Sequence, residues 1–371
     1  MRAVSIFSVQ PQRRLLLELM RLMELNDLLH AAVDSGASDI LLVAGSPPMF
    51  RINGDLQPAH LEALTPPVLE ELCRQIVSEE QFATLNQHQD LDFSLGVPQL
   101  GRFRFNLHRQ RNSYAAAIRY VAGDIPRLAD LRLPPAIEKL TFLTHGLVLV
   151  TGPTGSGKST TLAAMIDAIN RRESRHIITL EDPIEYQFAH DRSLVEQREI
   201  GVDCPGFASG LRHVLRQDPD VILVGELRDL ETIRTAMQAA ETGHLVLATL
   251  HSSSAAGTID RVVEVFPAEE QAQIRTHLSE SLRAVVTQRL LPAADGRGRV
   301  AAVEILIANR AIATSIREGS SHLIPGVIST HRRSGMQTMQ QSLEELVLNG
   351  RIMPEAIDEQ LEGAVPALEL V

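Results

Sequence analysis

Residues 150–162 read VTGPTGSGKSTTL and directly follow a short apolar run. Within them Gly152, Gly157, Lys158 and Ser159 keep the spacing Gly-x-x-x-x-Gly-Lys-Ser, which is typical of loops that hold the phosphates of a nucleotide. Glycine lets the backbone curl and bring its N–H groups close to phosphate oxygens. The helix expected to begin near Lys158 adds its positive N-terminal dipole. The stretch therefore predicts a strand, a phosphate-binding loop and a helix in succession.

Two side chains of this loop have specific expected roles. The Lys158 ammonium would reach the β- and γ-phosphates, and the Ser159 hydroxyl would coordinate Mg²⁺. ATP and Mg²⁺ are thus the expected ligands. The loop residues predicted to bind nucleotide are Gly152, Pro153, Thr154, Gly155, Ser156, Gly157, Lys158, Ser159 and Thr160.

Strands alternate with helices around this loop. Continuous apolar runs, as expected for parallel strands that are covered on both faces, occur at 147–151, 176–181, 221–226 and 245–250. The stretch 268–290 reads as one long helical segment, which a Gly-rich turn, a strand at 300–307 and a helical tail follow. We therefore predict an α/β domain with a parallel sheet over residues 137–371.

The first part of the chain has a different pattern. Residues 25–122 read as a small α+β domain, in which period-2 alternation over 101–121 predicts a β-hairpin. A Pro-punctuated segment of low periodicity, 123–136, is the predicted linker. Residues 1–24 are predicted to be an N-terminal extension with a first helix. A membrane-surface helix there, or a later start at Met20 or Met23, is an open alternative.

Acidic residues follow two of the predicted strands. Hydrolysis of ATP needs carboxylates that hold the metal and orient water. The turn after 176–181 supplies Glu181 and Glu185, and the strand 221–226 ends in Glu226. Phosphate-loop proteins usually place a metal-binding Asp at the end of this partner strand. Here Gly225 stands in that place, so a carboxylate of the first turn could share the metal and water duties with Glu226.

Two histidines flank the predicted strand 245–250. His251 follows the strand, and a strand beside that of the phosphate loop would carry it close to the γ-phosphate, where it could sense bound or hydrolysed nucleotide. His244 precedes the strand, so it is less suited to contact the same phosphate. A structural, hydrogen-bonded role is open for His244. The intervening strand keeps the two apart, which disfavours a shared metal.

Arginines alternate with phenylalanines in the predicted hairpin. The alternation sends Arg102 and Arg104 to one face of the strand and Phe103 and Phe105 to the other. The phenylalanines would anchor in the core of the small domain. The arginines form either a solvated basic face or, with Arg119, a cationic group that meets nucleotide phosphates from an adjacent domain or subunit.

The composition excludes several functional classes. A net charge of -11, 4% aromatic residues and no Trp disfavour nucleic-acid binding. Cys73 and Cys204 are the only cysteines, which excludes a cysteine zinc site and fits a reducing cytosol. No apolar run approaches the roughly 20 residues that span a bilayer. We expect a cytoplasmic protein without a transmembrane segment.

These motifs, in this order, resemble the type II/IV secretion ATPase superfamily. The resemblance is strongest to the pilus retraction motors, the twitching-motility ATPases called PilT, and to their PilU relatives. It covers the chain from about residue 25 to the final helices. The resembling segments are GPTGSGKST, EDPIEY, DPDVILVGELRDLETIRTA, AAETGHLVLATLHSSSAAGTIDRVVEVFP, RVAAVEIL and GMQTMQQSL.

The resemblance implies an α/β fold of two parts: a PAS-like N-terminal domain and a RecA-like ATPase domain with a P-loop. It implies a ring-shaped homohexamer, with nucleotide between the two domains of a protomer and arginines contributed across domain or subunit boundaries. With the residue patterns, it gives a set of catalytic residues: Glu185, Glu226, His251, Arg102 and Arg104. It makes Glu185 and Glu226 metal ligands beside Ser159, and adds Glu181, His244 and Arg119 to the nucleotide-binding residues.

The resemblance also implies a place in the cell. The protein would lie at the inner face of the cytoplasmic membrane, where ATP hydrolysis drives an inner-membrane pilus platform protein and extracts pilin from the base of the fibre. A paralogous retraction ATPase is a further implied partner.

Two departures from the family patterns bear on the direction of fibre movement. Assembly and secretion ATPases often carry a four-cysteine zinc module, which two cysteines cannot build, and this favours retraction. Retraction motors carry a helix close to Ala-Ile-Arg-Asn-Leu-Ile-Arg-Glu, whereas residues 311–318 read AIATSIRE. Four alternatives stay open: an assembly or secretion ATPase, a PilU-like accessory motor, a nucleotide-gated scaffold and a DNA translocase, which the acidic charge disfavours.

Overall fold

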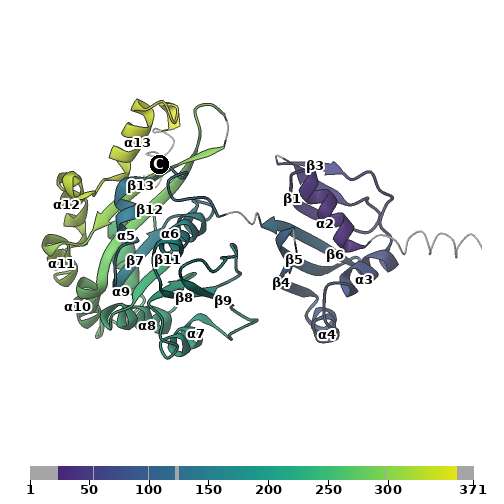
Figure 1. The fold of residues 1–371 in the computed structure, drawn as a ribbon, viewed down its shortest axis with the longest axis horizontal. Helices are drawn as coiled ribbons and strands as arrows, with labels where there is room; N and C mark the ends of the chain where they lie inside the picture. Colours follow the sequence, from purple (N-terminus) through teal and green to yellow (C-terminus); the bar gives the residue numbers. More distant parts are fainter. Residues whose placement is uncertain (1–23, 53, 99, 122–124, 297, 357–371) are drawn as a thin grey trace, which may run out of the picture. The chain divides into compact units, whose positions relative to one another are not determined.

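The computed structural model divides the chain into two compact units, residues 1–124 and 125–371 (Figure 1). The structure describes residues 24–52, 54–98, 100–121, 125–296 and 298–356. The predicted N-terminal extension, apart from Glu24, lies outside these residues. Among the helices of the described ranges, none combines the length and apolarity that crossing a membrane requires.

In its described residues, the first unit is an antiparallel sheet of six strands with three helices. The strand order is β3-β2-β1-β6-β5-β4. The strands are β1 (Ala37–Leu42), β2 (Met49–Ile52), β3 (Asp55–Pro58), β4 (Asp90–Val97), β5 (Gly101–Gln110) and β6 (Ser113–Val121). The helices are α2 (Leu25–Asp34), α3 (Pro66–Arg74) and α4 (Glu79–His88).

The hairpin β5–β6 forms as its sequence pattern predicts. Arg111 and Asn112 turn the chain with positive φ angles of 47° and 60°, a conformation that two-residue hairpins favour. Phe103 and Phe105 are fully buried in the core of the unit, whereas Arg104 is exposed. The alternation thus separates an apolar face from an arginine-bearing one.

The second unit is built on a sheet of seven strands in the order β13-β12-β7-β11-β10-β8-β9. All neighbours are parallel except β12 and β13, which pair antiparallel. The strands are β7 (Gly146–Thr151), β8 (His176–Glu181), β9 (Leu194–Glu199), β10 (Val221–Val224), β11 (Leu245–Leu250), β12 (Leu282–Pro292) and β13 (Arg299–Ile307).

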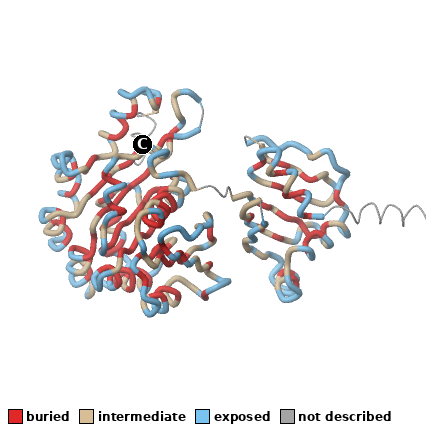
Figure 2. The backbone as a smooth tube through the Cα atoms, viewed as in Figure 1, coloured by how far each residue is buried: buried red, intermediate tan, exposed pale blue. Residues whose placement is uncertain are grey.

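Helices cover both faces of this sheet, and Figure 2 shows the buried residues concentrated along it. Leu147 and Leu149 of β7 pack into one core, and Val148 and Val150 into the other, so the strand is apolar throughout. The helices are α5 (Pro135–Leu140), α6 (Lys158–Arg172), α7 (Phe207–Val214), α8 (Leu230–Glu241), α9 (Ala255–Glu264), α10 (Gln271–Ser281), α11 (Arg310–Arg317), α12 (Ile324–Thr330) and α13 (Met339–Leu348), with 3-10 turns at Ser321–Leu323 and Arg332–Ser334.

The long helical segment predicted over 268–290 is wrong in its second half. Helix α10 ends at Ser281, and the chain continues at once as strand β12. This strand pairs with β7 on one side and β13 on the other, and its residues Val285 and Val286 are fully buried. Pairing with β7 and β13 buries the β-branched residues of this segment, and this favours a strand over the helix that the periodicity indicates.

The segment predicted as a linker contributes partly to the second unit. The unit begins at Ile125, and Leu128 and Leu133 pack against its core. Ala136 and Ile137 in helix α5 belong to the same core. Residues 125–136 therefore pack onto the second unit through these apolar contacts, although their sequence has low periodicity.

Candidate active site

The phosphate loop, residues 152–160, connects the end of β7 to the start of α6. Its three glycines adopt positive φ angles of 143°, 77° and 87°. A Cβ on Gly152 would lie 2.2 Å from the backbone oxygen of Gln288, and one on Gly157 would lie 2.8 Å from the Gln288 side chain. The loop therefore packs closely against β12, and glycine is required at both positions.

The Lys158 side chain closes this loop from the inside. Its Nζ donates to the carbonyl oxygens of Gly152 and Pro153, at 3.0 Å each. Burial lowers the pKa of Lys158, while the negative charges of Glu226 and Glu185 act in the opposite direction. The ammonium thus lies within electrostatic reach of both predicted catalytic carboxylates.

Glu226 follows β10 at the same edge of the sheet and has two basic neighbours. Its Oε1 lies 3.3 Å from His251 Nε2, and its Oε2 accepts from Arg228 Nε at 2.7 Å. The Glu226 side chain is 18% exposed. The histidine that follows β11 and the carboxylate that follows β10 are therefore brought together at one edge of the parallel sheet.

Glu181 braces the neighbouring turn. Its Oε1 accepts from Thr179 Oγ1 at 2.6 Å and from Gln197 Nε2 at 3.1 Å, and Gln197 Nε2 also donates to the Tyr186 carbonyl oxygen at 2.7 Å. Burial raises the pKa of Glu181, and these donors oppose that rise. The peptide bond before Pro183 in this turn is cis. Glu181 thereby holds the turn that carries Glu185.

These residues line one cavity of about 330 Å³ in the second unit. It brings together most of the predicted catalytic and metal-binding side chains of this unit. Its predicted members are Thr154, Gly155, Lys158, Ser159, Glu181, Glu185, Glu226 and His251.

The oxygen donors of this cavity fit Mg²⁺. A hydroxyl, Ser159, and two carboxylates, Glu185 and Glu226, line it, and Mg²⁺ prefers oxygen ligands shared with substrate phosphates and water. In the described part of the chain, no cluster of three or more His, Cys, Asp or Glu side chains could hold a metal by itself.

His244 is not brought to this cavity. It precedes β11, and its backbone oxygen accepts from Gly146 N at the start of β7, the opposite end of the strand from the phosphate loop. Its Nδ1 contacts the Ala239 carbonyl oxygen at 3.0 Å. His244 therefore lies at the end of α8, away from this chain's own phosphate loop, and its contact with nucleotide stays a prediction.

The three predicted arginines share one face of the first unit. Arg104 and Arg119 face each other across β5 and β6, and Arg102 lies two residues before Arg104. Arg119 Nε donates to Asp39 Oδ1 at 2.8 Å. Arg119 is therefore partly neutralised within its own unit, and nucleotide contact by these arginines stays a prediction.

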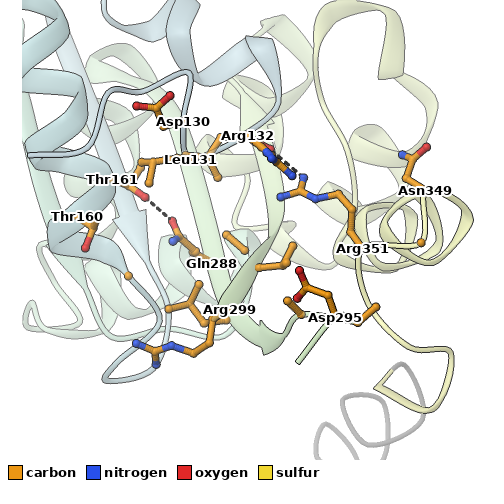
Figure 3. Close-up of a pocket in the computed structure, with 18 residues that line it drawn as sticks. Asp130, Leu131, Arg132, Thr160, Thr161, Gln288, Asp295, Arg299, Asn349 and Arg351 are labelled. Carbon is orange, nitrogen blue, oxygen red and sulfur yellow. Dashed lines mark hydrogen bonds between the residues drawn. The ribbon is translucent and has the colours of Figure 1, made fainter. Parts of the chain in front are cut away.

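A second cavity lies on the other flank of the loop and was missed from the sequence. Its volume is about 620 Å³, and Gly157, Thr160 and Thr161 line it together with Gln288 and Leu290 of β12 (Figure 3). Thr161 Oγ1 donates to Gln288 Oε1 at 2.9 Å. This wall could not be predicted, because the stretch that forms it reads as helix.

Comparisons with known proteins agree with this architecture. The family model described as "Type II/IV secretion system protein" matches residues 19–359. The Pseudomonas aeruginosa protein named "Type IV pilus retractation ATPase PilT" is 46% identical over 333 residues, which cover 90% of this chain and 96% of that protein. A Neisseria gonorrhoeae "Twitching motility protein" is 47% identical over 314 residues, which cover 85% and 84% of the two chains.

A solved structure is similar over almost the whole chain. It is described as the crystal structure of the pilus retraction motor PilT and bound ADP, and it aligns with a TM-score of 0.86 and 47% identity over 91% of this chain and 96% of that one. The second unit has the RecA-like fold of the secretion ATPases. The chain therefore belongs to the type II/IV secretion system protein family.

Proposed function

We propose that this protein is an ATP-hydrolysing motor that powers the retraction of type IV pili. The observation that carries the proposal is the convergence of Lys158, Glu185, Glu226 and His251 on one cavity beside the phosphate loop. The similarity to a pilus retraction ATPase over 90% of the chain supports the direction of the work.

The residues of the cavity have distinct roles in the proposed reaction. Backbone N–H groups of the loop and the Lys158 ammonium hold the phosphates. Glu226 orients the attacking water and accepts its proton, and His251, 3.3 Å away, fixes the position of that carboxylate. Ser159, Glu185 and Glu226 would hold Mg²⁺, which neutralises charge on the phosphate oxygens when bound. The 620 Å³ cavity on the other flank has room for the nucleoside.

Larger-scale parts of the proposal rest on the family. The protein would assemble as a homohexamer at the inner face of the cytoplasmic membrane and act on an inner-membrane platform protein, beside a paralogous retraction ATPase where the cell has one. Arg102 and Arg104 would approach nucleotide phosphates from an adjacent unit or subunit, where they stabilise the charge of the transition state.

Two substitutions test the enzymatic part. Glu226→Gln is expected to lower ATP turnover at least about 100-fold while ADP still binds, because it removes the proton acceptor and keeps the shape. Lys158→Ala is expected to weaken ADP binding about 10- to 100-fold, because it removes a charge-assisted contact to phosphate. Steady-state ATP hydrolysis and nucleotide affinity are measured for both.

Matched controls come from the same unit. Lys139→Ala replaces an exposed lysine of α5, and Glu231→Gln replaces an exposed carboxylate that pairs with Arg212. Both controls are expected to keep turnover and affinity. Parental turnover in Glu226→Gln would refute the role of that carboxylate, and a wild-type protein that binds ATP without hydrolysing it would refute the motor.

A further inference from the structure

Glu304 of β13 holds the start of helix α9. Its Oε1 accepts from the backbone N–H of Ala255 at 2.6 Å. Ala255 is the first residue of α9. The first N–H groups of a helix have no partner within the helix, so this side chain satisfies one such group of α9.

Helix α9 begins immediately after the segment that carries His251. Only residues 251–254 separate the end of β11 from Ala255. Leu250 is fixed in the sheet by its pairing with Thr151, and Glu304 fixes Ala255. A connection of four residues between two anchored ends leaves His251 little freedom, so the position of α9 determines how His251 meets Glu226.

A buried hydroxyl network holds the same helix against the phosphate-loop strand. Thr258 of α9 donates to Thr151 Oγ1 at 3.3 Å, and Thr151 and Thr287 Oγ1 atoms lie 2.9 Å apart. Thr287 pairs with Glu304 across β12 and β13. Helix α9 therefore has a second anchor besides Glu304, and loss of the Glu304 contact would shift its start without detaching the helix.

The charge of the carboxylate makes this tether strong. A hydrogen bond from a backbone N–H group to a carboxylate is shorter and roughly twice as strong as one to a neutral acceptor. An amide of the same size keeps one acceptor oxygen, loses the charge and adds a donor group. The substitution Glu304→Gln therefore weakens the contact with Ala255 with almost no change in volume.

We propose that Glu304 is a positioning residue for ATP hydrolysis, which holds the start of α9 so that His251 orients Glu226. This inference rests on the proposed function. Glu304 acts through α9 and touches no substrate.

The experiment measures turnover and amide exchange on the full chain. Glu304→Gln is expected to lower kcat about tenfold and leave KM for ATP unchanged, because small displacements of catalytic groups are costly. In a His251→Ala background the same substitution is expected to change kcat by less than about twofold, because residues that act through one another are not additive. Backbone amides of residues 251–258 are expected to exchange faster in Glu304→Gln than in the wild type.

Ser342→Ala is the matched control. Its Oγ accepts from Val303 N at 3.0 Å and fastens α13 to the same strand without contacting α9. It is expected to keep kcat and to speed exchange only within α13. Wild-type kcat in Glu304→Gln, an undiminished effect of that substitution in the His251→Ala background, or unchanged exchange at 251–258 would overturn the inference. A wild-type protein without ATPase activity would instead refute the proposed function, while the exchange measurement would still test the tether.

Discussion

Lys158 is the cation that we propose to hold the phosphates, and its surroundings predict how ADP binding responds to pH. Burial lowers its pKa from the ordinary 10.5. Only the charged ammonium attracts phosphate, so affinity is present below the pKa of the free protein and is lost as the pH rises through it. We predict that ADP affinity falls at a pH below 10.5, as isothermal titration between pH 7 and 10 would measure.

The control for this prediction is Lys139→Ala, which leaves the loop untouched and should give the same pH profile as the wild type. An ADP affinity that stays constant from pH 7 to pH 10 would show that phosphate binding does not depend on the charge of Lys158.

The identity of the site residues could be read from the sequence where spacing fixes geometry. The loop pattern predicted the positions of Lys158 and Ser159, and the strand pattern predicted that His251, which follows a strand, lies near the loop while His244, which precedes it, does not. The contact between His251 and Glu226 was not predicted, because it depends on the order of the strands in the sheet. The second cavity was not predicted, because β12 forms its wall and this strand follows the loop only after more than 120 residues of sequence.

Among the elements, strand β12 is the one that the sequence pattern did not predict. The periodicity of 268–290 indicates a helix, but residues 282–292 form a strand because they pair with β7 on one side and β13 on the other. Its polar residues Thr287 and Gln288 are buried and face the loop region through hydrogen bonds to Thr151 and Thr161. Buried hydrogen bonds of this kind hold the phosphate loop in place. Secondary-structure propensity, which depends on neighbouring residues in sequence, does not predict them.

This network predicts a measurable contribution to stability. Thr287→Val keeps the shape of the side chain and leaves the Thr151 hydroxyl without its partner on β12. We expect the free energy of unfolding to fall by about 1 kcal/mol, the usual cost of a lost buried hydrogen bond. Urea unfolding followed by circular dichroism measures it.

Thr276→Val on the exposed side of α10 is the comparison for this substitution, because it removes a hydroxyl outside the core. Equal unfolding free energies for the Thr287→Val and Thr276→Val proteins would contradict a stabilising role for the network under the loop.

At the scale of the whole molecule, the proposal requires the first unit to take part in hydrolysis. Arg104 is exposed on β5 beside Arg119, on the face opposite the buried phenylalanines. We predict that Arg104→Ala assembles into the same oligomer as the wild type and loses ATP turnover about 100-fold or more, because transition-state charge loses its stabilisation. Native mass spectrometry and steady-state ATPase assays check the two parts.

Arg51→Ala on β2 of the same unit is the control, since Arg51 contacts Gly54 and Asp39 within its own sheet. It should assemble and hydrolyse ATP as the wild type does. Full turnover in Arg104→Ala would show that Arg104 has no role in hydrolysis and would favour the alternative of a solvated basic face.

The most direct measurement of the central claim follows labelled pili on living cells. In a strain that lacks any paralogous retraction motor, the wild-type gene for this chain is replaced by one that carries Glu226→Gln. We expect pili to retract in the wild-type strain and to extend without retracting in the Glu226→Gln strain. Retraction at the same frequency in both strains would contradict it.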